Sequence, residues 1–230
     1  MLKKNDCVLD IGANIGAHTV FMSKLVTEGI VYAFEPDKLS YKKLNTNIAL
    51  NGCNNVKLIK LGIHNESDHL DFFSSKTSGK SDGNNSLHMN AFAGSSLSND
   101  EIQSYKIEVT TIDIFVEKEK IKPDFIKIDI EGNELKAFQG MTATIKKYKP
   151  TIIFEYGISY WWPLEDRSKF EKLLSPFYDC YIINELEAVE YPRSYFYKKP
   201  EYFSLDPTDL INVEDDCYIL CIDKNKFLKK

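Results

Sequence analysis

The sequence of 230 residues has few residues that bind transition metals or form disulfides. Cys217 and Cys221 are four residues apart, but no second pair of cysteines is present to complete a zinc site. The cysteines are odd in number and irregularly spaced: Cys7, Cys53, Cys180, Cys217 and Cys221. Such a set is typical of reduced, buried thiols rather than of a disulfide framework, and reduced thiols suit a cytoplasmic protein.

Signals for membranes, secretion and nucleic-acid binding are also missing. The first ten residues contain no apolar segment of a signal peptide, and no apolar run approaches the roughly 20 residues of a membrane span. The 29 Lys and Arg are outnumbered by 34 Asp and Glu, giving a net charge of -5 and no general attraction to phosphates. We therefore expect neither a membrane nor a nucleic-acid partner, and we interpret the basic residues at 224–230 as a solvated tail.

What is present is an alternation of short apolar runs with amphipathic stretches, which is typical of parallel βαβ units. The predicted strands cover residues 7–10, 30–34, 56–63, 125–130, 151–156, 180–184 and 217–222. The predicted helices cover residues 18–28, 39–50, 133–148 and 164–174, and a short helix begins at 110–113. The pattern predicts a doubly wound, Rossmann-like α/β domain that includes all 230 residues.

One stretch, at about 64–108, interrupts this alternation. Its first part is rich in Ser, Asn, Asp and Gly, with a possible short strand at 70–73, and the regular pattern resumes near Ile107. A structureless loop of this length is uncommon in a compact domain, so we expect an insertion that forms a hairpin or a lid. A lid at Asn84–Ser86 would close over a cofactor.

Carboxylates lie at or near the ends of four of the predicted strands. They are Asp10, Glu35, Asp129 and Glu155. The carboxyl ends of parallel strands meet at one edge of a sheet, where open α/β folds bind their ligands. Because like charges close together repel, we expect a ligand with hydroxyl groups or a positive centre at this edge.

The turn after the first strand has the sequence Ile-Gly-Ala-Asn-Ile-Gly, residues 11–16. Asn14 breaks the dinucleotide pattern G-x-G-x-x-G, and no G-K-[ST] of a phosphate loop follows. Asp10, two residues before Gly12, suits an ammonium group, and Glu35 is placed to bind two ribose hydroxyls. Together they indicate an adenosine ligand with a charged amino-acid tail, S-adenosylmethionine. For the two glycines alone, a plain turn between strand and helix is the alternative.

A second pattern spans residues 125–134. Strand alternation places Lys127 and Asp129 on the same face. A lysine inside a central strand needs a carboxylate partner, so a purely structural ion pair is an alternative to a functional role. Glu131 and Glu134 lie at the start of the next helix, where they could instead stabilise the helix dipole and its free amides.

These residues resemble the FkbM family of methyltransferases. The matching segments, in order, are 8–16, 34–36, 47–51, 111–113, 127–134, and Pro150 with Phe154 and Glu155. The resemblance implies a class I methyltransferase fold, with a mostly parallel sheet and an antiparallel last strand. It also implies S-adenosylmethionine as the donor and, usually, O-methylation of a sugar, polyketide or related metabolite. The expected acceptor is therefore a hydroxyl of a small molecule or glycan.

The expected contacts to the cofactor follow from these motifs. Its methionine end is assigned to Asp10, Gly12, Asn14 and Gly16, and its ribose to Glu35. The remaining expected contacts are Ala13, Pro36, Gly62 and Asp129.

For catalysis, Asp129 is the first candidate base and Glu131 the second, with Lys127 and His18 as further candidates. His64, His69 and His88 are other possible bases, and Tyr160, Trp161 and Trp162 could stack on a sugar or pack in the core. We expect no metal, although carboxylates such as Asp129, Glu131 and Glu155 could hold magnesium.

Three other functions stay open. An NAD-dependent oxidoreductase or epimerase shares the acidic residue at the second strand, but Asn14 and the lack of a Tyr-x-x-x-Lys pair disfavour it. A protein that binds S-adenosylmethionine without catalysis is the second alternative. A nucleic-acid methyltransferase is opposed by the net acidity and the lack of an N-P-P-Y-like string after Asp129.

Overall fold

The computed structural model describes residues 2–76, 86–87, 98–156, 164–183, 202–205 and 217–226. By its internal contacts the chain divides into two units, Met1–Pro150 and Thr151–Lys230, which are described separately below. The organisation as one domain, which the sequence suggested, stays a prediction.

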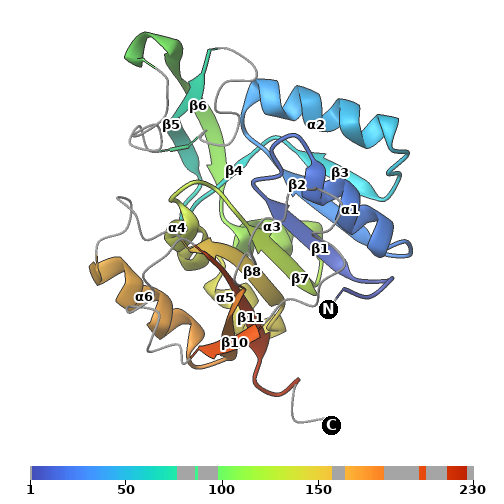
Figure 1. Ribbon diagram of the computed structural model, residues 1–230, viewed down its shortest axis with the longest axis vertical. Helices are drawn as coiled ribbons and strands as arrows, with labels where there is room; N and C mark the ends of the chain where they lie inside the picture. The colour runs from blue at the N-terminus through green and yellow to red at the C-terminus, as the bar shows by residue number, and fades with distance from the viewer. Residues whose placement is uncertain are drawn as a thin grey trace. The chain divides into compact units, whose positions relative to one another are not determined.

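The first unit alternates strands and helices along the chain (Figure 1). Its elements are β1 (Cys7–Ile11), α1 (Ala17–Leu25), β2 (Ile30–Phe34), α2 (Lys38–Leu50), β3 (Val56–Ile59), β4 (Gly62–Ile63), β5 (Asp68–Ser75), a 3-10 turn (Asn99–Glu101), β6 (Ile102–Thr110), α3 (Ile112–Glu119), β7 (Phe125–Ile128), α4 (Glu134–Gln139) and α5 (Thr142–Tyr148). Strands β1, β2, β3 and β7 run parallel in the order β7-β1-β2-β3. The chain thus changes direction across the sheet between β1 and β7, and this switch point is where such folds bind ligands.

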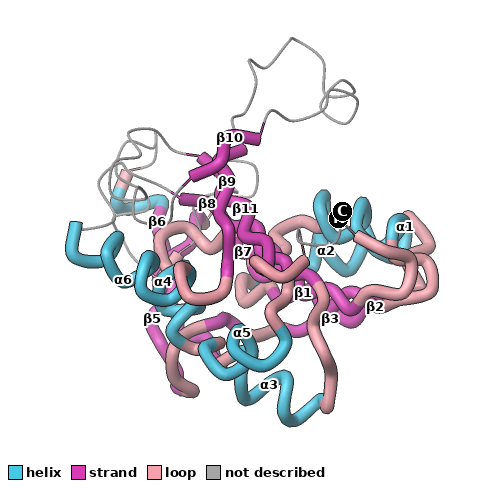
Figure 2. The backbone as a smooth tube through the Cα atoms, turned by 90° about the horizontal axis from the view of Figure 1, so that it is seen from below, coloured by secondary structure: helices cyan, strands magenta, loops and turns pink. Residues whose placement is uncertain are grey.

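Helices cover both faces of these parallel strands (Figure 2). Residues of β2 alternate between the faces: Val31 packs in a core cluster with Met22 of α1. Tyr32 and Phe34 face the other way and contact the Phe115 ring of α3 edge-to-face, with ring centroids 5.4 and 4.8 Å apart. This two-sided burial confirms the predicted doubly wound class.

The predicted third strand at 56–63 is wrong as one element. β3 ends at Ile59, and Gly62–Ile63 form β4, which belongs to a second sheet with the order β4-β6-β5. β6 runs parallel to β4 and antiparallel to β5. An apolar run does not reveal that the chain leaves one sheet for another within two residues.

The predicted helix at 133–148 is also wrong as one element, because α4 and α5 are separate. Gly140 lies so close to the His64 carbonyl that a β-carbon there would be 2.2 Å from that oxygen. The Asp113 carboxylate then starts a new helix by accepting the backbone N–H groups of Ala143 and Thr144, at 3.0 and 2.7 Å. The break is therefore imposed by contacts distant in sequence.

The second unit is built on antiparallel pairs. Its elements are β8 (Thr151–Tyr156), α6 (Leu164–Leu174), β9 (Tyr178–Ile183), β10 (Tyr202–Leu205) and β11 (Cys217–Asp223). The order is β10-β9-β11-β8, and β11 is antiparallel to both β8 and β9, which confirms the predicted antiparallel last strand. The aromatic, proline-bearing segment 191–203 predicts a loop, and this prediction is wrong at its end, because Tyr202 and Phe203 begin β10.

Among the described residues, no helix combines the length and the apolar character that a bilayer span requires. His88, Asn84, Asn85 and the aromatic run Tyr160–Trp162 lie outside the described residues.

Candidate cofactor and active site

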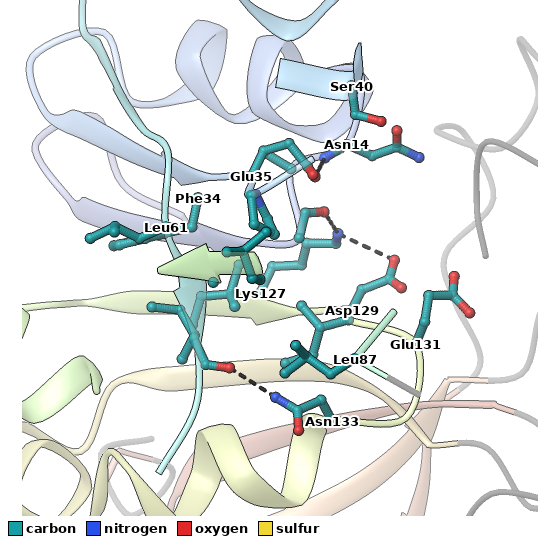
Figure 3. Close-up of a pocket in the computed structure, with 18 of the residues that line it drawn as sticks. Asn14, Phe34, Glu35, Ser40, Leu61, Leu87, Lys127, Asp129, Glu131 and Asn133 are labelled. Atoms are coloured by element: carbon teal, nitrogen blue, oxygen red, sulfur yellow. Dashed lines mark hydrogen bonds and ion pairs between the residues drawn. The ribbon is translucent and has the colours of Figure 1, made fainter. Parts of the chain in front are cut away.

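A cavity of about 330 Å³ lies in the first unit, at the carboxyl ends of β1 and β7 (Figure 3). Its volume is within the range of small-molecule sites. Ten of the residues predicted for the site line it: Gly12, Ala13, Asn14, His18, Glu35, Pro36, Gly62, Lys127, Asp129 and Glu131. Two predicted residues, Asp10 and Gly16, do not line the cavity.

The turn after β1 is shaped by contacts to neighbouring strands. Gly12 has a φ of 79°, and a β-carbon there would be 1.8 Å from the Asp129 carbonyl oxygen. The N–H groups of Gly12 and Ala13 both donate to the Phe34 carbonyl of β2, at 3.1 and 2.9 Å. Glycine is thus required at position 12 by the close approach of two backbone segments, as the alternative of a plain turn between strand and helix predicts.

Glu35 follows β2 and is buried beside the cavity, with only 6% of its surface exposed. Its two carboxylate oxygens accept the backbone N–H groups of Asn14 and Asp37, each at 2.8 Å. Burial raises the pKa of Glu35 to about 7, although these two hydrogen bonds lower it. Because each carboxylate oxygen can accept a second hydrogen bond, the fixed carboxylate can still bind hydroxyl groups of a ligand.

Lys127 of β7 is buried, and its Nζ lies 3.2 Å from Asp129 Oδ2 and 3.7 Å from Asp10 Oδ1. It also donates to the Gly12 carbonyl at 3.1 Å. The predicted pairing of this lysine with carboxylates at the strand ends is confirmed. Its charge is thereby compensated within the protein.

Asp10 of β1 is buried and does not line the cavity. Its side chain has no exposed surface and accepts the Thr19 hydroxyl at 2.5 Å, in addition to its ion pair with Lys127. Asp10 therefore supports the lysine, and its direct contact with a cofactor stays a prediction. Gly16, which precedes α1 with a φ of 95°, packs against Leu44, and its contact with a cofactor also stays a prediction.

Glu131 lies in a tight turn after β7. It has a φ of 53° and is followed by Gly132 with a φ of 92°. The turn is held by two hydrogen bonds: Ile130 N–H donates to Glu134 Oε1 at 2.8 Å, and Ser86 Oγ donates to the Glu131 carbonyl at 2.7 Å. Glu134 is buried and organises this turn, so its role in the described chain is structural.

The Glu131 side chain lines the cavity next to that of Asp129 (Figure 3). Burial and the nearby charges of Asp129 and Glu134 raise the pKa of Glu131 to about 8. A carboxyl group with this pKa exchanges a proton near neutral pH, as general bases do.

His18 is the one histidine among the described residues that lines the cavity. Desolvation beside the cavity, followed by the charge of Lys127, lowers the pKa of His18. His64 and His69 do not line the cavity.

One wall of the cavity was not foreseen from the sequence. The inserted segment contributes Phe72 of β5, Leu87 and Ile107 of β6, which lie with Leu61 and Ile63 in the cavity lining. The alternation of apolar and polar residues around Phe72 and around Ile107 predicts that each strand has one apolar face. This pattern does not indicate that the apolar face adjoins a ligand site.

The cavity thus has an apolar wall, a buried carboxylate at Glu35, and an acidic side formed by Asp129 and Glu131. In Figure 3, Leu61 and Phe34 lie on the side opposite Glu131. This arrangement suits a ligand that combines an apolar ring, hydroxyl groups and a positive charge.

Comparison with known proteins identifies related methyltransferases. Hexuronic acid methyltransferase AglP of Haloferax volcanii is 27% identical over 152 residues, which are 66% of this chain and 56% of AglP. Methyltransferase sdnD of Sordaria araneosa is 33% identical over 70 residues, which are 30% of this chain and 27% of sdnD. The crystal structure of methyltransferase FkbM from Methylobacillus flagellatus has the same fold, with a TM-score of 0.56 and 19% identity.

That structural match covers 96% of this chain and 44% of the other chain, so the chain spans about half the length, or less, of these relatives. The model of the methyltransferase FkbM domain matches residues 10–175, which is well over half of the chain. The chain therefore belongs to the FkbM methyltransferase family.

Proposed function

We propose that this protein binds S-adenosylmethionine and transfers its methyl group to a hydroxyl oxygen of a sugar, glycan or other small metabolite. The observation that supports this most strongly is the buried Glu35 carboxylate beside the cavity. Both of its oxygens are fixed by backbone amides, so its position is set before any ligand arrives.

The cavity residues fit the parts of this cofactor. The wall formed by Leu61, Phe72 and Ile107 suits adenine, and Glu35 suits the ribose hydroxyls. The turn at 12–14 and Asp129 would hold the amino-acid end, with Pro36 and Gly62 completing the lining. Bound S-adenosylmethionine supplies an electrophilic methyl group on a sulfonium centre.

Glu131 is our first candidate for the base that accepts the proton of the acceptor hydroxyl. The Asp129 carboxylate lies 3.2 Å from Lys127 Nζ and is therefore engaged in an ion pair within the protein. Glu131, by contrast, has a pKa raised to about 8 and lines the same side of the cavity. We assign Asp129 to orienting the acceptor or the cofactor, and His18, at the cavity edge, to the acceptor side.

The proposal of a sugar acceptor is supported by the resemblance to a hexuronic acid methyltransferase. A hexuronic acid offers hydroxyl groups and a carboxylate. A base at Glu131 is useful for a hydroxyl acceptor, because a carboxylate has no proton to lose at neutral pH. The acidic side of the cavity would also repel a carboxylate.

The test is transfer of a tritiated methyl group from S-adenosylmethionine to a panel of hexuronic acids, neutral sugars and small glycans. We expect labelling of at least one hydroxylated acceptor by the wild type and its loss with Glu131→Gln. Glu108→Gln, an exposed glutamate on β6, is the matched control and should behave as wild type. Cofactor binding without transfer to any acceptor would favour the non-catalytic alternative, and NAD binding would favour an oxidoreductase.

A further inference from the structure

We propose that Tyr105 is a positioning residue for the cofactor, because it fixes the turn after β2 that holds Glu35 beside the cavity. Tyr105 lies on β6 of the three-stranded sheet β4-β6-β5, called the inserted sheet below. This inference rests on the proposed use of S-adenosylmethionine, and it assigns to the inserted sheet a role in donor binding. Tyr105 lies 68 residues after Asp37 in the sequence, yet its hydroxyl reaches that side chain.

A short series of hydrogen bonds leads from Tyr105 to Glu35. The Tyr105 hydroxyl donates to Asp37 Oδ1 at 2.5 Å and accepts the Lys38 N–H at 3.3 Å. Asp37 N–H in turn donates to Glu35 Oε1 at 2.8 Å. The other Asp37 oxygen accepts two N–H groups at the start of α2, from Leu39 at 2.9 Å and from Ser40 at 2.7 Å.

The Tyr105 ring is itself held in place. Lys38 Nζ lies 4.7 Å from the ring centroid, and the Phe72 ring lies 5.9 Å from it. Burial and the hydrogen bond to Asp37 raise the pKa of Tyr105, so the hydroxyl stays protonated and remains a donor. The hydrogen bond from Tyr105 to Asp37 therefore persists across neutral pH.

The inserted sheet contacts the other side of the site as well. Phe72 and Ile107 line the cavity, and Ser86 donates to the Glu131 carbonyl. A displacement of this sheet would therefore change the apolar wall and the support of Glu35 together. This is why the Tyr105 contact is expected to affect cofactor affinity and not only stability.

The charges that act on Glu35 give a second readout. Asp37, in the same turn, raises the pKa of Glu35, and Lys127 of β7 lowers it. Ribose hydroxyls donate to the ionised carboxylate, so affinity should rise with pH through about 7. Without the Tyr105 hydroxyl, the charge of Asp37 would be less compensated, and this inflection would move to higher pH.

The experiment is calorimetric titration of S-adenosylhomocysteine between about pH 6 and 9 into wild type, Tyr105→Phe and Tyr148→Phe, with urea denaturation of each. Tyr148, half-buried on α5, is the matched control. For Tyr105→Phe we expect a Kd about tenfold higher, because the competent turn is less populated, and an inflection at higher pH. Tyr148→Phe should match wild type in both.

Two results would overturn the inference while leaving the proposed function intact. One is a Tyr105→Phe protein with the wild-type Kd and inflection. The other is a lower denaturation midpoint with weaker binding but an unchanged inflection, which would give Tyr105 a structural role alone. A wild type that binds no S-adenosylhomocysteine would overturn the proposed function and this inference with it.

Discussion

Glu131 combines an unusual backbone conformation with a partly buried carboxylate. A left-handed φ of 53° is strained for a residue with a side chain, and such strain is often found at functional sites. Here the turn is held by Ser86 and Glu134, and it directs Glu131 toward the cavity. From the sequence motif, Asp129 was predicted as the first candidate base and Glu131 as the second. The sequence does not show that Asp129 forms an ion pair with Lys127 or that Glu131 is partly buried beside the cavity.

Replacing Glu131 by Gln should lower kcat by about 10²- to 10⁴-fold, the usual contribution of a general base. In the wild type, kcat should rise with pH through about 8, since the base acts when deprotonated. The variant should lose this dependence while its Kd for S-adenosylhomocysteine changes by less than about threefold. The measurement is a pH profile of methyl transfer, and an unchanged profile in Glu131→Gln would remove Glu131 from the mechanism.

A second residue-scale prediction concerns Gly12. Gly12→Ala places a β-carbon 1.8 Å from the Asp129 carbonyl, so the ends of β1 and β7 must separate. We expect a loss of about 3 kcal/mol or more in the free energy of unfolding. Gly52→Ala is the control: its φ of 63° is also positive, but no atom lies within 4 Å, so about 1 kcal/mol is expected. Equal losses in urea denaturation would contradict this explanation.

At the scale of elements, the sequence was sufficient for the alternation of strands and helices in the parallel part of the fold. Strand β2 is a continuous apolar run, β1 is apolar except for Asp10, and Asn51 and Gly52 follow the end of α2. The division of 56–63 between two sheets and of 133–148 between two helices was not predictable, because both depend on distant contacts. Gly140 against the His64 carbonyl is the clearest case.

The start of α5 provides an element-scale test. The Asp113 carboxylate of α3 accepts two backbone N–H groups and the Thr144 hydroxyl at the first turn of α5. Asp113→Ala should lower the free energy of unfolding by about 1–2 kcal/mol, as the loss of a helix cap does. The matched control is Asp71→Ala, which removes an exposed ion pair to Lys106 and should cost less than about 1 kcal/mol. Similar costs for both in urea denaturation would argue against the cap.

At the scale of the whole molecule, three carboxyl groups that are buried or partly buried have raised pKa values. These are about 7 for Glu35, about 8 for Glu131 and about 7 for Glu134, against an ordinary value of 4.5. A raised folded-state pKa means that the folded protein binds more protons than the unfolded chain in this interval. The corresponding stability is fully present below pH 4.5 and is lost as pH rises through about 8.

We therefore predict that the free energy of unfolding decreases between about pH 5 and 8, by about 3 kcal/mol for Glu35 alone. Glu35→Gln should show a shallower decrease, whatever its absolute stability. The measurement is urea denaturation at several pH values. A free energy of unfolding that rises with pH over this range would contradict the raised pKa values of these groups.

The most direct test of donor binding is calorimetric titration of S-adenosylhomocysteine and, separately, NAD into the wild type and Glu35→Gln. We predict one site for S-adenosylhomocysteine, no binding of NAD, and at least about tenfold weaker binding of S-adenosylhomocysteine by Glu35→Gln, because a buried hydrogen-bonded carboxylate is lost. Binding of NAD alone, or binding of S-adenosylhomocysteine that Glu35→Gln leaves unchanged, would contradict the assignment of this cavity to the methyl donor.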